Sequence, residues 1–130
     1  MARELHDHKV NPANEKLSVT ALDAPGDGGA CHLYHISGFT AARNPSASDR
    51  YSLEVELLFQ NGPIPEVGVN GITHEALLAV LIDRLRGFQA GPFGCRENAL
   101  ALTKLEEAMH WLHHRTRGRM ARGVEGTHER

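Results

Sequence analysis

The stretch GITHEALLAVLIDRLRGFQAGPFGCRENALALTKLEEAMHWLHHRTRGRMAR, residues 71–122, decides the fold, because its apolar residues recur at helical spacing on both sides of a short break. Thr73 is a suitable N-cap, and Glu75 places an acid in the first turn, where the helix dipole favours it. We therefore expect a helix that follows Thr73 and ends near Gln89. Its apolar face comprises Leu77, Leu78, Leu81, Ile82, Leu85 and Phe88.

A stop signal separates this helix from a second one. Gly91 and Pro92 cannot continue a helix, and the connection AGPFGC is only a few residues long. The second helix is expected from about Arg96 to about Arg122, with an apolar stripe at Leu102, Leu105, Met109 and Leu112. Two helices joined by so short a loop must lie antiparallel, so the pattern predicts a helical hairpin.

Upstream of the hairpin, three segments have the composition of strands. KLSVTAL alternates apolar and polar residues before the turn DAPGDGG, and ACHLYHISGF is a second candidate. The clearest alternation is in YSLEVELLFQ, where one face carries Tyr51, Leu53, Val55, Leu57 and Phe59. The sequence therefore predicts an α+β fold, in which a small N-terminal antiparallel β-sheet of three strands precedes a long C-terminal antiparallel helical hairpin.

The same pattern divides the chain into four parts. Residues 1–15 are polar without a clear period and are expected to form a flexible arm. Residues 16–69 carry the sheet, residues 70–122 form the hairpin, and residues 123–130 are expected to be a frayed tail.

Length and composition limit the class of protein. A chain of 130 residues with 41% hydrophobic and 23% charged content is sized for one compact domain. It has neither the run of roughly 18 apolar residues that spans a membrane nor an apolar signal peptide, so we expect a cytoplasmic protein without membrane contact. Cys31 and Cys95 lack a CxxC partner and are expected to be reduced.

Charge is unevenly distributed along the chain. The net charge of -2 argues against a protein that coats DNA or RNA, which requires a strong positive field. Yet residues 110–122, HWLHHRTRGRMAR, contain four arginines and no acid. The sequence therefore permits a local anion site in a protein that is not basic overall.

Catalytic and metal chemistry find little support. His110, His113 and His114 have a spacing that can present two imidazoles to one metal ion, but a chain with nine histidines produces such groups by chance on a solvated helix. Neither cysteine has an activating motif, and GDGG is not a phosphate loop because no GK[ST] follows. We expect no enzyme, no metal and no cofactor; a histidine-metal hydrolase is a distant alternative.

A helix-turn-helix DNA-binding regulator is the main alternative function, because two helices meet at a short glycine-containing turn and the second ends in arginines. Two features disfavour it. The second helix is longer than a recognition unit needs, and its arginines lie far from the amino-terminal turns that usually contact bases.

Two groups of residues are candidates for ligand binding. Trp111, Arg115 and Arg119 are spaced i, i+4 and i+8, so they form one stripe that suits a base and phosphates. The structural alternative is that Trp111 packs in the core and the arginines are merely solvated. At the hairpin tip, aromatic, amide and cationic groups gather around the loop: Phe88, Gln89, Phe93, Arg96 and Asn98. There the alternative for the phenylalanines is packing.

The motifs GFQAGPFGCREN, TKLEEA and ARGVEGTH, within residues 70–128, give the hairpin a family resemblance. The segment resembles the helical-hairpin domain of phage anti-defence sponges, the Thoeris and anti-CBASS types, and the order of sheet and hairpin is similar to the Thoeris type. The resemblance implies sequestration of cyclic ADP-ribose isomers without cleavage in the host cytoplasm. It further implies cyclic trinucleotides at a second site, and homo-oligomers that are hexamers built from dimers.

The resemblance also implies roles for individual residues. Phe88 would stack on the adenine, Asn98 would hydrogen-bond the ligand, and the diphosphate would be held by Arg115 and Arg119. Asn98 and Arg115 are 17 positions apart on the second helix, which is about 25 Å at 1.5 Å per residue. One nucleotide cannot bridge them within a chain. The pocket should therefore combine the hairpin tip of one subunit with the arginine end of another.

Overall fold

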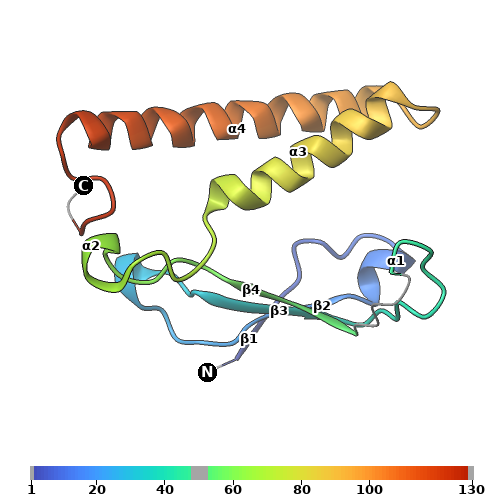
Figure 1. Ribbon diagram of the computed structural model, residues 1–130. Coiled ribbons are helices and arrows are strands. Elements are labelled where there is room, and N and C mark those ends of the chain that lie inside the picture. The colour runs from blue at the N-terminus through green and yellow to red at the C-terminus, as the bar shows by residue number, and fades with distance from the viewer. Residues whose placement is uncertain (1, 48–52, 129–130) are drawn as a thin grey trace. The chain divides into compact units, whose positions relative to one another are not determined.

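A computed structural model describes residues 2–47 and 53–128 of the chain (Figure 1). The chain forms two compact units, Met1–Asn61 and Gly62–Arg130. The first unit contains the sheet and the second contains the helical hairpin. The α+β class predicted from the sequence, with an antiparallel sheet before a long helical region, is confirmed.

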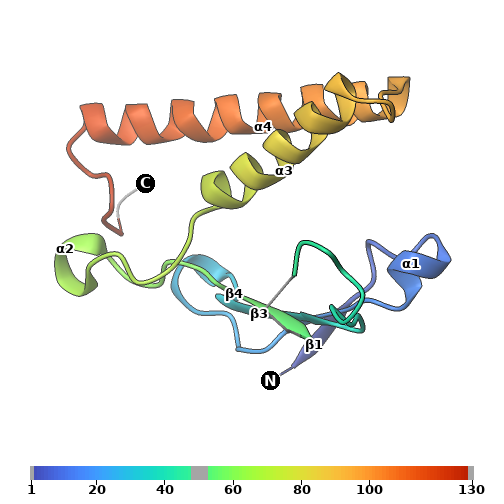
Figure 2. The same ribbon diagram turned by 45° about the vertical axis from the view of Figure 1, so that its right-hand side comes forward.

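The sheet is a simple antiparallel meander. Its strands are β1 (Arg3–Leu5), β2 (Ser18–Ala21), β3 (Leu33–Ser37) and β4 (Glu54–Leu58), in the spatial order β1-β2-β3-β4. Between β2 and β3, Thr20 lies opposite His35. Between β3 and β4, His35 Nε2 lies 2.8 Å from a carboxylate oxygen of Glu54, so a side-chain contact joins the two strands. Figure 2 shows β4 beside β3 in the turned view.

The sheet has one strand more than the sequence predicted. Residues 3–5, within the expected arm, pair with β2 as β1, and a short helix α1 (Pro12–Glu15) follows, capped by the side chain of Asn11. Three residues are too few to display a strand period, so only pairing with β2 makes this strand recognisable. The strand predicted to begin at Tyr51 is β4 from Glu54 onward, and Tyr51 lies outside the described residues.

Asp23 organises the connection between β2 and β3. Its carboxylate accepts the backbone N–H of Leu33 at 3.1 Å and that of His32 at 3.0 Å. The bond from Leu33, assisted by that from His32, lowers the pKa of Asp23, because both donors favour the charged carboxylate. The glycine-rich turn that precedes β3 is η1 (Asp27–Gly29), where Gly28 has a φ of 77°.

The second unit contains α2 (Ile64–Val67), α3 (His74–Ala90) and α4 (Arg96–Ala121). Thr73 caps α3 by accepting the N–H of Ala76 at 3.1 Å, as its position before the apolar run predicts. α4 begins one residue after its N-cap Cys95 and is unbroken for 26 residues. α3 and α4 pack against each other as the predicted hairpin. No helix in the described part of the chain is long and apolar enough to cross a membrane.

Few apolar side chains are fully buried. Among the described hydrophobic residues, only Ala21, Cys31 and Ile82 are buried, and the two cysteines are free thiols. Several large apolar side chains are exposed on both units: Leu53, Val55, Leu58, Val80, Leu81, Leu100, Trp111 and Met120. Exposed apolar surface on this scale is typical of chains that associate with partners.

Candidate functional site

The hairpin tip is the loop between α3 and α4, where two aromatic rings are in contact. The rings of Phe88 and Phe93 meet edge to face, with their centroids 6.1 Å apart. The guanidinium of Arg84 lies 4.9 Å from the centre of the Phe88 ring, which is a cation–π distance. Phe88 is half-buried, whereas Phe93 is 71% exposed. An apolar ring is therefore presented to solvent at the tip, which a planar base could cover.

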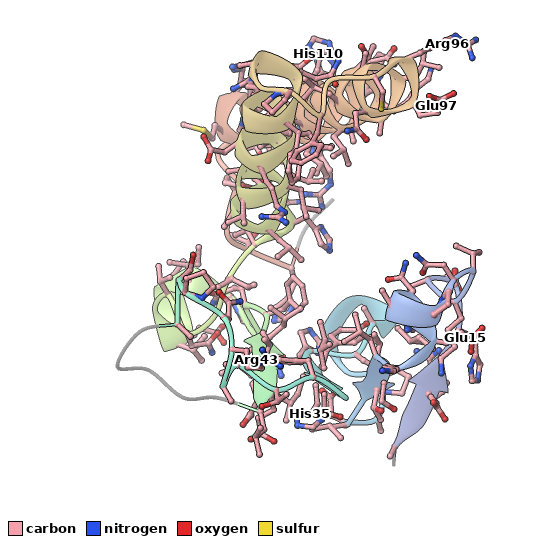
Figure 3. The ribbon with its side chains drawn as sticks, turned by 90° about the vertical axis from the view of Figure 1, so that its right-hand side faces the viewer. Glu15, His35, Arg43, Arg96, Glu97 and His110 are labelled. Carbon is pink, nitrogen blue, oxygen red and sulfur yellow. The ribbon has the colours of Figure 1, made fainter. Side chains whose placement is uncertain are left out.

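Polar contacts hold this loop in place. Gln89 accepts the backbone N–H of Cys95 at 2.9 Å through its side-chain oxygen, and the Cys95 sulfur accepts the N–H of Asn98 at 3.4 Å. The Asn98 amide nitrogen donates to the carbonyl of Phe93 at 3.5 Å, a long bond that leaves the amide able to contact a ligand. Arg96 extends away from the amino end of α4 (Figure 3). The five residues that the sequence places at the tip thus lie around one loop.

Toward the other end of α4, Trp111 is 65% exposed, so the alternative in which it packs in the core does not hold. Its indole ring contacts two histidines edge to face, His110 at 5.2 Å and His114 at 5.6 Å between centroids. The imidazoles of His110 and His114 are themselves stacked at 6.4 Å. Across residues 2–47 and 53–128, no three His, Cys, Asp or Glu side chains converge to hold a metal ion. The arrangement is an aromatic surface of three rings, with the indole of Trp111 open to solvent and nearly perpendicular to both imidazoles.

Beside this surface lies a shallow hollow of about 430 Å³, which we call the arginine hollow. It is lined by His114, Arg115, Gly118, Arg119 and Arg122. Gly118 contributes no side chain, and a Cβ atom there would meet nothing within 4 Å. Three guanidiniums around one open hollow form an electropositive site that suits a phosphorylated ligand.

Two of these arginines have no side-chain partner among the residues that the structure describes. Arg115 and Arg122 are exposed, and neither makes a side-chain hydrogen bond or ion pair with any residue that the structure describes. Arg122 follows Arg115 by seven positions, which is about two helical turns, so both side chains lie on one side of α4. Their donors are available to an anion.

Arg119 has a different environment and is only 4% exposed. Its Nε donates to Glu125 at 2.9 Å, and its Nη2 donates to the carbonyl oxygens of Val124 at 2.7 Å and Thr127 at 3.0 Å. These bonds fold residues 124–127, which were expected to be frayed, back onto α4. The turn is continued by a bond from the N–H of Ile64 to the carbonyl of Gly126 at 2.8 Å.

The predicted residues therefore form two groups on one chain. The tip group is Phe88, Phe93, Arg96 and Asn98, and the arginine end is Trp111, Arg115 and Arg119. Because α4 is a single unbroken helix, the 17 positions from Asn98 to Arg115 correspond to about 25 Å, so the structure does not bring the groups together within a chain. The sequence analysis did not predict that His114 and Arg122 line the hollow. The available signal was helical spacing, because His114 follows Trp111 by three positions and Arg122 follows Arg115 by seven.

Comparison with known proteins identifies the hairpin. Residues 54–117 match the profile of the Acb2/Tad1 hairpin domain, a range that covers β4, the tip group, Trp111 and Arg115. A protein of Bacillus phage SBSphiJ7 named Thoeris anti-defense 1 is 58% identical over 72 residues, which cover 55% of this chain. The matched region is 51% of that relative, so the chain spans about half the relative's length. The chain therefore carries an Acb2/Tad1 hairpin domain and is homologous to a phage Thoeris anti-defence protein.

Proposed function

We propose that this protein is an anti-defence sponge, which binds a cyclic ADP-ribose-type immune signal in the host cytoplasm and holds it without cleaving it. Blocking of Thoeris-type immunity follows from removal of the free signal. The observation that carries the proposal is the arginine hollow beside an exposed aromatic surface, in a chain whose hairpin is homologous to a Thoeris anti-defence protein.

The ligand class imposes two chemical requirements, and the two groups of residues meet them. An adenine needs an aromatic face and an amide or carbonyl partner, which Phe88 and Asn98 supply at the tip. A diphosphate needs cations with several N–H donors, which Arg115 and Arg119 supply in the arginine hollow. Stacking on an aromatic ring is worth about 1–3 kcal/mol per base, and each charge-assisted hydrogen bond about 1.5–3 kcal/mol.

The separation of the two groups requires more than one subunit. A nucleotide that contacts both must lie where the tip of one chain meets the arginine end of another, which two antiparallel hairpins permit. The exposed apolar residues of α3 and α4, among them Val80, Leu81 and Leu100, favour such association. We propose a homo-oligomer whose pockets are shared between subunits, a hexamer built from dimers being the form that the family resemblance implies.

Ligand recovery tests the proposal. The protein is incubated with a cyclic ADP-ribose isomer, separated from free ligand by ultrafiltration, heated to denature it, and the released material is identified by chromatography. We expect loss of the isomer from the filtrate and its return, chemically intact, on heating. Recovery of ADP-ribose would instead make the protein an enzyme.

A matched pair of variants links any binding to the hollow. Arg115→Ala removes an unpaired guanidinium from the hollow, and we expect binding to weaken by about 10- to 150-fold. Arg117→Ala removes the same charge from an exposed position of α4 that does not line the hollow, and binding should be retained. Equal losses in both variants would show that general charge, and not the hollow, attracts the ligand.

A further inference from the structure

One of the arginines that line the hollow, Arg119, is paired with an anion of the chain itself. The Glu125 carboxylate lies 2.9 Å from Arg119 Nε. Arg119 lines the hollow with two other arginines, a histidine and a glycine, and Glu125 is not one of the lining residues. The two partners differ sharply in exposure: the Arg119 side chain is 5% exposed, whereas that of Glu125 is 36% exposed. A carboxylate at this position can leave for solvent more easily than the guanidinium can move.

The other bonds of Arg119 hold its guanidinium in place when Glu125 leaves. Nη2 donates to two backbone carbonyls, those of Val124 and Thr127, and neither bond depends on the Glu125 side chain. Exchange of the carboxylate for a phosphate oxygen would therefore preserve the position of Arg119 and replace one charge-assisted bond by another. The exchange alone brings little net gain, because a bond is lost for each bond formed.

We infer that Glu125 is a specificity-determining residue of the ligand site, one that favours linked phosphates over a single phosphate. This inference rests on the proposed function. A single phosphate binds at Arg115, which has no partner in the described chain, and leaves the Arg119–Glu125 pair intact. A diphosphate reaches both arginines, so its contact with Arg115 supplies the gain that compensates for displacing Glu125. Glu125 thus competes with a phosphate for Arg119, and this competition selects against the ligand that has only one phosphate.

The inference predicts the sign of a charge-removing substitution. In Glu125→Gln the neutral amide keeps the shape of the side chain but binds Arg119 less strongly than a carboxylate does. A diphosphate ligand should then bind more tightly, by up to about fivefold, since the lost contact is a partly exposed ion pair. A monophosphate should bind as before. A residue that merely holds residues 124–127 in place would give the opposite result, a loss of affinity for both ligands.

Calorimetric titration decides between these outcomes. A cyclic ADP-ribose isomer and AMP are titrated into the unmodified protein, Glu125→Gln, and the control Glu107→Gln, which removes the same charge from an exposed pair with Lys104 outside the hollow. We expect the diphosphate-to-monophosphate affinity ratio to rise only in Glu125→Gln. An unchanged or reduced ratio in that variant overturns the inference. If Glu125→Gln binds the cyclic isomer and the unmodified protein does not, the inference holds while the proposed function fails. If neither the unmodified protein nor Glu125→Gln binds the isomer, the inference and the proposed function both fail.

A measurement on the unmodified protein covers the case in which Glu125→Gln does not fold. In NMR spectra of protein with ¹⁵N-labelled arginine, the Nε–H signal of Arg119 should move when the cyclic isomer binds and stay in place when AMP binds. The signal of Arg117, outside the hollow, is the internal reference. Movement of the Arg119 signal by AMP to the same extent would contradict the proposed selection.

Discussion

Co-expression of subunits that carry Asn98→Ala with subunits that carry Arg115→Ala should rebuild ligand pockets that neither variant forms alone. The two residues lie on one unbroken helix, about 25 Å apart, so a single nucleotide contacts both only where two chains meet. Each variant keeps the half of the pocket that the other has lost. A pocket shared between chains therefore predicts complementation, whereas a pocket within one chain excludes it.

The contacts of Arg115 and Asn98 determine how much ligand-binding free energy each substitution should remove. Arg115 is exposed and has no partner in the described chain, so Arg115→Ala should remove about 1.5–3 kcal/mol of ligand binding, which is about 10- to 150-fold in affinity. Asn98→Ala removes a neutral amide bond worth about 0.5–1.5 kcal/mol and also frees the loop carbonyl of Phe93. Arg115→Lys should restore binding only in part, because an ammonium cannot form a bidentate contact.

The assay uses two affinity tags, so that assemblies containing both variants are purified in sequence and confirmed by native mass spectrometry. With random pairing, each half of a pocket is intact in about one half of cases, so about a quarter of the pockets should regain full affinity. The count of high-affinity sites in a titration with a cyclic ADP-ribose isomer measures that fraction. Mixed assemblies that bind no better than either parent would refute the shared pocket.

Three further predictions concern assembly and stability. Light scattering at micromolar concentration should detect an oligomer, because the single chain leaves much apolar surface exposed; a monomer would remove the shared pocket. Gly38→Ala should destabilise the protein by about 2 kcal/mol or more in thermal unfolding, because Gly38 has a φ of +97° and an added Cβ would lie 1.9 Å from the Lys16 carbonyl oxygen. Gly87→Ala, within α3, should instead stabilise the protein by up to about 1 kcal/mol, because an added Cβ there meets nothing within 4 Å. The pKa of Asp23 is lower in the folded state than in the unfolded state. The stability that the Asp23 carboxylate contributes is therefore present above the unfolded pKa of about 4 and is lost as the pH falls through the folded pKa. In Asp23→Asn, the free energy of unfolding should fall less steeply at acid pH, which thermal unfolding at several pH values measures.

The sequence predicts the hairpin well because its signals are local. Thr73 and the Gly91–Pro92 pair act within a few residues, and the expected second helix, from about Arg96 to about Arg122, agrees with α4 (Arg96–Ala121) to within a residue. The strand β1 escaped prediction because its identity depends on pairing with β2, a contact that a three-residue pattern does not encode. Local signals therefore sufficed where helices were concerned and failed where a distant partner defined the element.

The candidate site shows the same division. Helical spacing places Arg115 and Arg119 on one stripe and gives no reason to distinguish them. In the structure Arg115 is exposed and unpaired among the described residues, whereas Arg119 is buried by Glu125 and two carbonyls. The difference arises beyond the helix, where Gly123, with a φ of 73°, turns the chain back toward Arg119. Periodicity ends with the helix and so could not predict this contact.

The fixed position of Arg119 matters for the proposed function, in which the protein would act by affinity alone. One stacked base and two charge-assisted bonds together supply about 4–9 kcal/mol before any entropic cost, which corresponds at best to about micromolar binding. A sponge that lowers a signal below its threshold needs tighter binding, so little of this energy can be spent on ordering side chains. The carbonyls of Val124 and Thr127 hold the Arg119 guanidinium before any ligand arrives, which removes most of its rotamer entropy from the cost of binding. Thr127 also donates its hydroxyl hydrogen to Val124, so the turn that holds the guanidinium is itself braced. Under the proposed function, the held Arg119 would fix the position of the phosphates, and the exposed Arg115 would supply the second contact.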